Sequence, residues 1–418
     1  MLRHACLKGV VTGVFKKGES MSGDLRVQGF EAAAVKANIR KKDRLDLALI
    51  YSTVPAVAAG VFTTSRVKAA PVLLDMERLA GGRAQAIVVN SGIANACTGG
   101  EGMRLARETA RLAAEALGID QELVQVASTG VIGEQLHLAR FEAAMPGLAD
   151  KRSPEGFADV ARAMMTTDTV PKTAVRTVVV GGKEVRLMGL AKGAGMIMPN
   201  MATMLGFVVT DAAVAPDALR AMLKAAADRS FNRITVDGDT STNDTVLLLA
   251  NGLAGNPLLD GSDPNAVVGF QAALDDLTKD LALQIVRDGE GASKLVTVRV
   301  RGGRSEAEAL DAARTIANSP LVKTAFFGED ANWGRIIAAL GRSRAEFDAE
   351  RVDIAFDEVV MVKNGLGQGA DAEARATRVL KQKEFAVNID LKSGPGLGEI
   401  HTCDFSLDYV KINADYRS

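Results

Sequence analysis

The stretch KGAGMIMPNMATMLGFVVTD, residues 192–211, is the part of the chain around which the rest of the sequence can be organised. Its first half contains two glycines and the pair Pro199-Asn200, which favour a turn. Its second half contains residues 204–209, a continuous apolar run that is typical of a buried strand. Thr203 therefore stands where a flexible segment enters a strand, a place where functional side chains are often found.

The glycines of this stretch do not form a known phosphate-binding loop. A dinucleotide fingerprint would need a third glycine where Met198 stands, and a P-loop would end in Gly-Lys-Ser/Thr. Two interpretations stay open on the local sequence alone. The segment is either an ordinary turn followed by an ordinary strand, or a site of chemistry at Thr203.

The second interpretation is that Thr203 is a nucleophile released by self-cleavage. Its hydroxyl would attack the carbonyl of Ala202, and hydrolysis of the resulting ester would leave Thr203 as a new N-terminus. A threonine hydroxyl needs a base beside it, and a free α-amine with a pKa of about 7.7–8.0 supplies one. The glycines in the segment would permit the unusual backbone geometry that attack on the preceding carbonyl requires.

Composition excludes several classes of function. The chain has 418 residues, which predicts one to three domains, and a formal net charge of −1, which argues against nucleic acid or an anionic membrane as partner. No apolar stretch is long enough for a membrane span, and no secretory signal is expected. The scattered Cys6, Cys97 and Cys403 predict neither a disulfide framework nor a metal site, and they favour a cytoplasmic protein.

Hydrophobic periodicity predicts alternating strands and helices, and therefore an α/β class. Strands are predicted at residues 45–51, 56–62, 85–89, 123–127, 175–180, 184–190, 294–300 and 400–410. Helices are predicted at residues 103–117, 157–165, 216–227, 266–286 and 336–340. Gly181-Gly182 between two of the strands predicts a hairpin.

Four further polar segments have both a structural and a functional interpretation. Thr129-Gly130 is either a turn or a pair of hydrogen-bond donors for an oxyanion. Residues 166–172, TTDTVPK, are expected to be solvent-exposed unless they contact a substrate, and the same holds for Glu290 on its glycine-flanked turn. Residues 237–244 lack the glycine and glutamate placement of a calcium loop, so a supporting structural role is predicted for them.

Several of these segments together resemble the ornithine acetyltransferase family, also called glutamate N-acetyltransferases. The resemblance covers nearly the whole chain and is carried by KGAGMIMPNMATML, Ser-Thr-Gly at 128–130, Asp-Gly-Glu-Gly at 288–291, GEDANWGR at 328–335 and the tail KINADYRS at 411–418. It implies a four-layer α/β/β/α sandwich of the self-cleaving type. It also implies an alpha chain, residues 1–202, and a beta chain, residues 203–418, assembled as a heterotetramer with two copies of each.

The resemblance also implies roles for individual residues. Thr129 and Gly130 would form the oxyanion hole, and Thr203 would be the nucleophile. The substrate contacts would be Thr166, Lys192, Thr203, Glu290, Asn413 and Ser418. Lys192 would hold the α-carboxylate shared by both substrates, and Glu290 would hold the side-chain ammonium of ornithine.

The expected reaction is a ping-pong transfer of an acetyl group from N-acetyl-L-ornithine to L-glutamate in arginine biosynthesis, with no cofactor. The sequence leaves open whether acetyl-CoA is an alternative acetyl donor. Two other interpretations are an N-terminal-nucleophile aminopeptidase of similar design and a non-catalytic amino-acid-binding protein. Acetyl transfer to glutamate would separate the first from the transferase, and an intact Ala202–Thr203 bond would favour the second.

Overall fold

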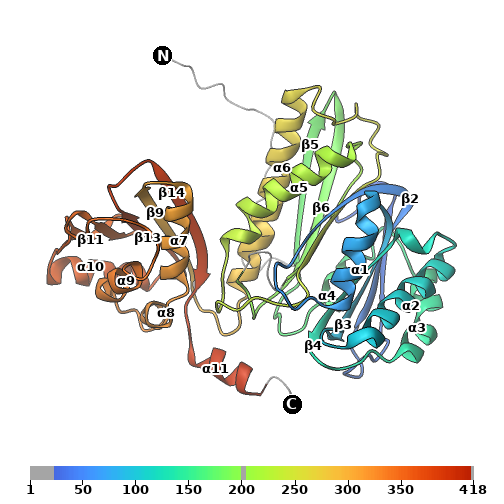
Figure 1. The fold of residues 1–418 in the computed structure, drawn as a ribbon, viewed down its shortest axis with the longest axis horizontal. Coiled ribbons are helices and arrows are strands. Elements are labelled where there is room, and N and C mark those ends of the chain that lie inside the picture. The colour runs from blue at the N-terminus through green and yellow to red at the C-terminus, as the bar shows by residue number, and fades with distance from the viewer. Residues whose placement is uncertain (1–22, 199–203, 416–418) are drawn as a thin grey trace. The chain divides into compact units, whose positions relative to one another are not determined.

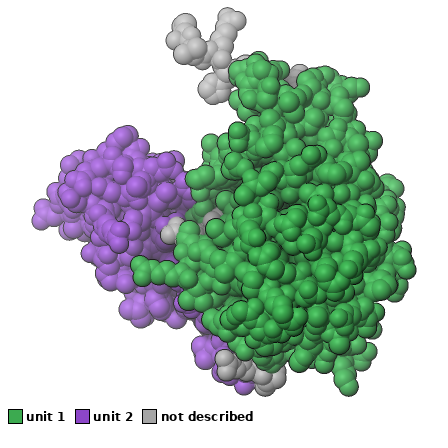
Figure 2. Space-filling model, turned by 45° about the vertical axis from the view of Figure 1, so that its right-hand side comes forward, with its two compact units in different colours: residues 1–193, 200–232, 240–282 green, residues 194–199, 233–239, 283–418 purple. Residues whose placement is uncertain are grey.

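The computed structural model describes residues 23–198 and 204–415, which divide into two compact units (Figures 1 and 2). The described residues of unit 1 fall within the ranges 1–193, 200–232 and 240–282. Those of unit 2 fall within 194–199, 233–239 and 283–418. Each unit has its own sheet and its own helices, and each is described below by itself.

Unit 1 is built on an eight-stranded sheet with the order β4-β3-β2-β8-β7-β6-β5, in which β1 pairs with β2. The pairs β3–β4 and β7–β8 are parallel, and the other pairs are antiparallel. The strands are β1 (Phe30–Val35), β2 (Leu47–Phe62), β3 (Arg83–Ile93), β4 (Val124–Val131), β5 (Lys172–Val180), β6 (Lys183–Lys192), β7 (Leu205–Thr210) and β8 (Thr245–Ala250).

Both faces of this sheet are buried. Successive residues of a strand point to opposite sides of the sheet, and on β2 both sets are packed in hydrophobic clusters. On β2, Leu47 and Leu49 belong to one hydrophobic cluster, whereas Ala48 and Ile50 belong to another. The first cluster includes residues of α1 (Ala70–Arg78), α2 (Gly99–Leu117) and α3 (Leu138–Asp150), and the second includes residues of α4 (Phe157–Ala163). The remaining long helices are α5 (Pro216–Arg229) and α6 (Pro264–Arg287).

Unit 2 is built on a six-stranded sheet with the order β12-β11-β10-β13-β9-β14, in which only the β13–β9 pair is parallel among the described strands. Its strands are β9 (Leu295–Gly303), β10 (Asp353–Phe356), β11 (Val359–Lys363), β12 (Leu366–Gly367), β13 (Glu384–Asp390) and β14 (Gly396–Cys403). Its helices are α7 (Glu306–Ala317), α8 (Pro320–Phe327), α9 (Trp333–Leu340), α10 (Ala370–Leu380) and α11 (Leu407–Ala414). Alternate residues of β9, namely Val296, Val298 and Val300, are fully buried in the core that these helices cover.

The predicted α/β class is confirmed, and the two sheets and two sets of helices that a four-layer sandwich needs are present. The predicted hairpin is also confirmed, since β5 and β6 are joined by Gly181 and Gly182, both with positive φ. Two predictions were wrong in detail. The strands predicted at 45–51 and 56–62 form the single irregular strand β2, whose pairing with β3 shifts register between Tyr51 and Ala56.

The strand predicted at residues 400–410 is only partly correct, because β14 ends at Cys403 and the helix α11 follows. The side chain of Ser406 accepts hydrogen bonds from the backbone N–H groups of Asp408 and Tyr409, at 3.2 and 3.4 Å. A serine in this position satisfies N–H groups that the first helical turn leaves unpaired. This local cap outweighs the alternating pattern of the sequence.

In the described part of the chain, no helix has both the length and the apolar character needed to cross a membrane.

Candidate active site

The register of β6 and β7 places the two residues that flank the segment 193–204 on neighbouring strands. Lys192 is the last residue of β6, and it pairs with Leu205, the first residue of β7. The predicted cleavage residues Ala202 and Thr203 lie between these strands in sequence and outside the described residues. The described site is therefore built from the side chains around Lys192 and around Met204, the residue that follows Thr203.

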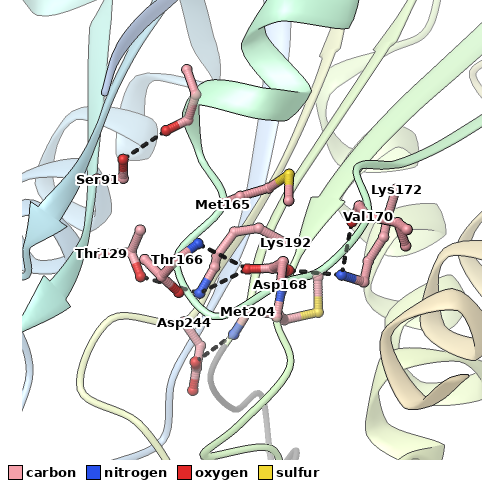
Figure 3. Close-up of polar contacts among 12 residues, drawn as sticks. Ser91, Thr129, Met165, Thr166, Asp168, Val170, Lys172, Lys192, Met204 and Asp244 are labelled. Carbon is pink, nitrogen blue, oxygen red and sulfur yellow. Dashed lines mark hydrogen bonds and ion pairs between the residues drawn. The ribbon is translucent and has the colours of Figure 1, made fainter. Parts of the chain in front are cut away.

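Asp168 is the centre of the polar contacts beside Lys192 (Figure 3). It lies between α4 and β5, and its side chain has no exposed surface. Its Oδ1 accepts hydrogen bonds from Lys172 Nζ at 2.7 Å and from the backbone N–H of Gly193 at 2.6 Å. Its Oδ2 accepts from the backbone N–H of Thr166 at 3.0 Å and lies 3.9 Å from Lys192 Nζ. One carboxylate thus connects three segments of the chain.

The charge state of Asp168 follows from these neighbours. Burial by itself would raise the pKa of Asp168, but the positive charges of Lys192 and Lys172 outweigh burial and hold the pKa well below its ordinary value. The carboxylate is therefore charged at neutral pH. Lys192 and Lys172 place two buried ammonium groups beside this carboxylate, and a buried ammonium is suited to binding a ligand carboxylate.

The predicted oxyanion pair lies near the end of β4. Thr129 is buried, and its Oγ1 accepts a hydrogen bond of 3.3 Å from Lys192 Nζ (Figure 3). Gly130 has a φ of +131°, and a Cβ at this position would lie 2.2 Å from the carbonyl carbon of Gly92 on the parallel strand β3. Only glycine fits there, so the close approach of the two strands fixes the backbone beside Thr129.

A network of asparagine and serine side chains holds the loops around this pair. Ser128 Oγ donates to Asn90 Oδ1 at 2.6 Å. From the loop before β8, Asn243 Nδ2 donates to the carbonyls of Ala94 and Ser128, at 2.6 and 2.8 Å. These buried bonds agree with the supporting role that the sequence predicts for residues 237–244, and they connect the ends of β3 and β4 to the loop that precedes β8.

Asp244 binds the backbone N–H of Met204, as Asp168 binds the backbone N–H of Gly193. Its side chain is buried, and Oδ1 accepts a 2.9 Å hydrogen bond from the backbone N–H of Met204 (Figure 3). Oδ2 is buried without a hydrogen-bond partner among the described residues. Burial raises the pKa of Asp244 well above its ordinary value, and the Met204 N–H, the Thr63 hydroxyl and the charge of Lys192 offset this only in part. A carboxyl in such surroundings favours its neutral form.

In unit 2, Glu290 is buried beside the segment that follows Lys192 and Gly193. Its backbone N–H donates to the carbonyl of Ala194 at 2.8 Å, and its Oε2 accepts from Asn413 Nδ2 at 2.8 Å. A Cβ on Gly195 would lie 2.3 Å from Glu290 Oε2, so a glycine is needed for this close approach. Of the two interpretations of Glu290, the solvent-exposed glutamate is excluded by this burial, and the substrate contact stays a prediction. The carboxylate is enclosed by the segment 194–198 and by α11.

Asp237 fixes the same short segment of unit 2. Its carboxylate accepts hydrogen bonds from the backbone N–H groups of Met196 and Ile197, at 2.5 and 2.8 Å. Burial raises the pKa of Asp237 above its ordinary value, and the backbone N–H groups of Met196, Asp239 and Ile197 offset this only in part. Through these two hydrogen bonds Asp237 holds the segment at Met196 and Ile197. In residues 23–198 and 204–415, no group of three or more His, Cys, Asp or Glu side chains could hold a metal ion.

The structure gathers the described site residues predicted from the sequence into two groups. Thr129, Gly130, Thr166 and Lys192 belong to unit 1, where Thr166 is half-buried and contacts Asp168 through its backbone. Glu290 and Asn413 contact each other in unit 2. Ser418, like Ala202 and Thr203, lies outside the described residues.

Sequence reasoning missed the importance of Asp168 and misjudged its exposure. Solvent exposure was one of the two interpretations of the TTDTVPK stretch, whereas Asp168 is buried against two lysines. Lys172, four positions along the chain, was the one available signal, because a carboxylate and a lysine at short spacing can pair. Asp244 gave no such signal, since its partner Met204 is distant in the sequence.

Comparison with known proteins gives a consistent result. Residues 31–418 match the model of the ArgJ family. The chain is 57% identical over 394 residues to the arginine biosynthesis bifunctional protein ArgJ of Desulfotalea psychrophila, covering 94% of this chain and 100% of the relative. It is 55% identical, with the same coverage, to the protein of that name from Geobacter sulfurreducens. A crystal structure of the ArgJ protein from Bacillus halodurans is 44% identical, covers 50% of this chain and 97% of that chain, and gives a TM-score of 0.48.

Proposed function

Because this chain belongs to the ArgJ family and is a glutamate N-acetyltransferase of arginine biosynthesis, we propose that it moves an acetyl group from N2-acetyl-L-ornithine to L-glutamate through an acetyl ester on Thr203. The observation that carries the proposal is the buried group of Lys192, Asp168 and Thr129, in which Lys192 begins the stretch 192–211 that contains Thr203. It combines the ammonium of Lys192 with a hydroxyl donor, the two groups that an α-carboxylate and a developing oxyanion require.

The first step of the proposal is self-cleavage. Thr203 Oγ attacks the carbonyl carbon of Ala202, the carbon–nitrogen bond breaks, and an ester joins the two residues. Water then hydrolyses the ester, which leaves a carboxylate on Ala202 and a free amine on Thr203. The products are the alpha chain, residues 1–202, and the beta chain, residues 203–418, which stay together as a heterotetramer with two copies of each.

The second step is acetyl transfer in two halves. The Thr203 hydroxyl, with its own α-amine as base, attacks the acetyl carbonyl of acetylornithine, and ornithine leaves with the proton. Glutamate then takes the acetyl group by the reverse sequence. Thr129 and Gly130 donate to the oxyanion in both halves, and loss of one such donor typically lowers kcat by about 10²–10³-fold.

Substrate recognition is divided among the remaining residues. Lys192 would bind the α-carboxylate that both substrates share, with Thr166 beside it. Glu290, which Asn413 holds in place, would bind the ornithine ammonium, whereas Asn413 and Ser418 would donate to the side-chain carboxylate of glutamate. We infer no cofactor, because exchanging one amide for another is nearly neutral in free energy. Acetyl-CoA would serve as an alternative donor for acetylglutamate synthesis.

The experiment that tests the proposed function uses Thr203→Ala and the wild-type chain. The wild type is expected to give two bands on a denaturing gel and to transfer acetyl from acetylornithine to glutamate. Thr203→Ala is expected to give a single band and no transfer, because both steps need the hydroxyl. A Thr203→Ala protein that is still cut at this bond, or that still transfers acetyl, contradicts the proposal.

A further inference from the structure

Asp168 has more partners than a structural ion pair requires. Its two oxygens accept from the backbone N–H groups of Thr166 and Gly193 and from the ammonium of Lys172, and they face the ammonium of Lys192 (Figure 3). Lys172 alone would neutralise the charge of Asp168, because its Nζ lies 2.7 Å from Asp168 Oδ1 and its side chain is also fully buried. The additional contact with Lys192, at 3.9 Å, attracts a second ammonium to the same place.

The contact between Lys192 and Thr129 determines what the threonine hydroxyl can do. An ammonium group has only donors, so in the 3.3 Å bond Lys192 Nζ donates and Thr129 Oγ1 accepts. A threonine hydroxyl has one hydrogen and two lone pairs. Because Lys192 donates to one lone pair of Thr129 Oγ1, the hydroxyl hydrogen of Thr129 points to another acceptor. A hydroxyl that donates to an oxyanion must have its hydrogen available in this way.

We propose that Asp168 is a positioning residue for acetyl transfer: it holds Lys192 where the ammonium donates to Thr129, and so directs the Thr129 hydroxyl towards the oxyanion. This inference rests on the proposed function, which gives Asp168 no contact with the substrate or the nucleophile. Asp168 also binds the N–H of Gly193, so the residue after Lys192 is fixed by the same carboxylate. The order of action is Asp168, then Lys192, then Thr129.

The test is a double-mutant cycle with Asp168→Asn and Thr129→Val, measured as kcat for transfer between acetylornithine and glutamate. Both substitutions nearly preserve side-chain shape. Each single variant is expected to lower kcat by about 10²-fold, the effect of losing one oxyanion donor. In the Thr129→Val background, Asp168→Asn is expected to lower kcat by less than about 3-fold, because two residues that act through one hydroxyl are not additive.

Two further variants keep the result interpretable. Asp75→Asn is the matched control, because Asp75 is also fully buried, accepts only one described hydrogen bond, from the N–H of Val126, and belongs to no proposed contact with substrate. Its kcat is expected to equal that of the wild type. If Asp168→Asn does not fold, Asp168→Asn with Lys172→Met replaces it, since the pair removes one buried charge of each sign.

Each outcome decides. Independent losses that multiply to about 10⁴-fold in the double variant overturn the proposal, as does an Asp168→Asn protein with wild-type kcat. An Asp168→Asn protein that folds but stays uncut also overturns it, because Asp168 would then act on cleavage rather than on Thr129. If the wild type itself transfers no acetyl group to glutamate, the proposed function fails, whatever the variants do.

Discussion

The buried carboxyl groups of Asp168 and Asp244 differ in charge, although each accepts a hydrogen bond from a backbone N–H, of Gly193 and of Met204 respectively. Asp168 accepts from Gly193 and lies beside two lysines, so its pKa is held well below the ordinary value. Asp244 accepts from Met204, and burial raises its pKa well above the ordinary value. Depth of burial alone does not decide the charge of a carboxyl. The number of cations within a few ångströms does.

The difference has a functional consequence in unit 1. A charged Asp168 can hold Lys192 by electrostatic attraction, whereas a neutral Asp244 can hold Met204 only by its hydrogen bond. The segment that contains the predicted cleavage bond is therefore attached by an ionic contact before it and by a neutral contact after it.

Asp168→Ala is expected to destabilise the protein most. It would remove the carboxylate that pairs with the buried Lys172 and lies beside the buried Lys192, and removal of one partner of a buried ion pair typically costs about 3–5 kcal/mol. The measurement is the free energy of unfolding in urea. A loss of less than about 1 kcal/mol would contradict the assignment of a charged Asp168 and would remove the basis of the comparison.

Asp244→Ala is expected to cost less, about 1–3 kcal/mol, because it leaves one N–H unpaired and no charge. The same urea measurement gives the value, and the informative quantity is the difference from Asp168→Ala. If the two losses are equal, or if Asp244→Ala is the more destabilising, the claim that Asp244 is neutral is wrong.

The two carboxyls are expected to give stability opposite dependences on pH. The folded pKa of Asp168 lies below its ordinary value of 3.8, so its stabilisation is present above that pH and is lost as the pH falls through the folded pKa. The folded pKa of Asp244 lies above 3.8, so its contribution is complete below that pH and is lost as the pH rises through the folded pKa.

Asp244→Asn separates the pH-dependent contribution of Asp244 from that of Asp168, because an amide does not titrate. Relative to the wild type, this variant is expected to gain stability as the pH rises from about 4, by at most about 1.4 kcal/mol per pH unit. Urea unfolding at several pH values between 4 and 7 measures it. A relative stability that falls with rising pH would show that Asp244 is charged in the folded protein.

Asp159→Asn is expected to change least, within about 0.5 kcal/mol, because its pair with Arg162 on α4 is more than half exposed on both sides. Asp159→Asn is the exposed counterpart of Asp168→Asn, in which the same substitution is made at a buried position. Urea unfolding of the two variants side by side gives the comparison. An equal loss at both positions would mean that burial adds nothing to the Asp168 contacts.

Local signals in the sequence were enough for much of the fold. Gly181-Gly182 marked the β5–β6 hairpin, and the apolar run after Thr203 marked β7. They failed where a contact distant in sequence or a cap decides the outcome. The alternation of residues 400–410 could not reveal the Ser406 cap, and nothing beside residues 45–62 showed that two apolar runs share one strand.

The site divides in the same way. The segments around Thr203, Thr129 and Glu290 carried the resemblance to the ornithine acetyltransferase family, and that resemblance pointed to acyl transfer chemistry. The supporting groups could not be found in this way, because Asp168 and Asp244 derive their properties from Lys192 and Met204, which lie 24 and 40 positions away. The charge of a buried carboxyl is a property of the fold, and no window of sequence contains it.

The central claim is that Thr203 is freed by cleavage of its own backbone and then carries the acetyl group. The most direct test is an intact-mass spectrum of the wild-type protein, before and after brief incubation with acetylornithine without glutamate. We predict two chains that meet between Ala202 and Thr203, and then the mass of one acetyl group added to the chain that begins at Thr203. A single uncut chain that transfers acetyl at the wild-type rate would contradict the account.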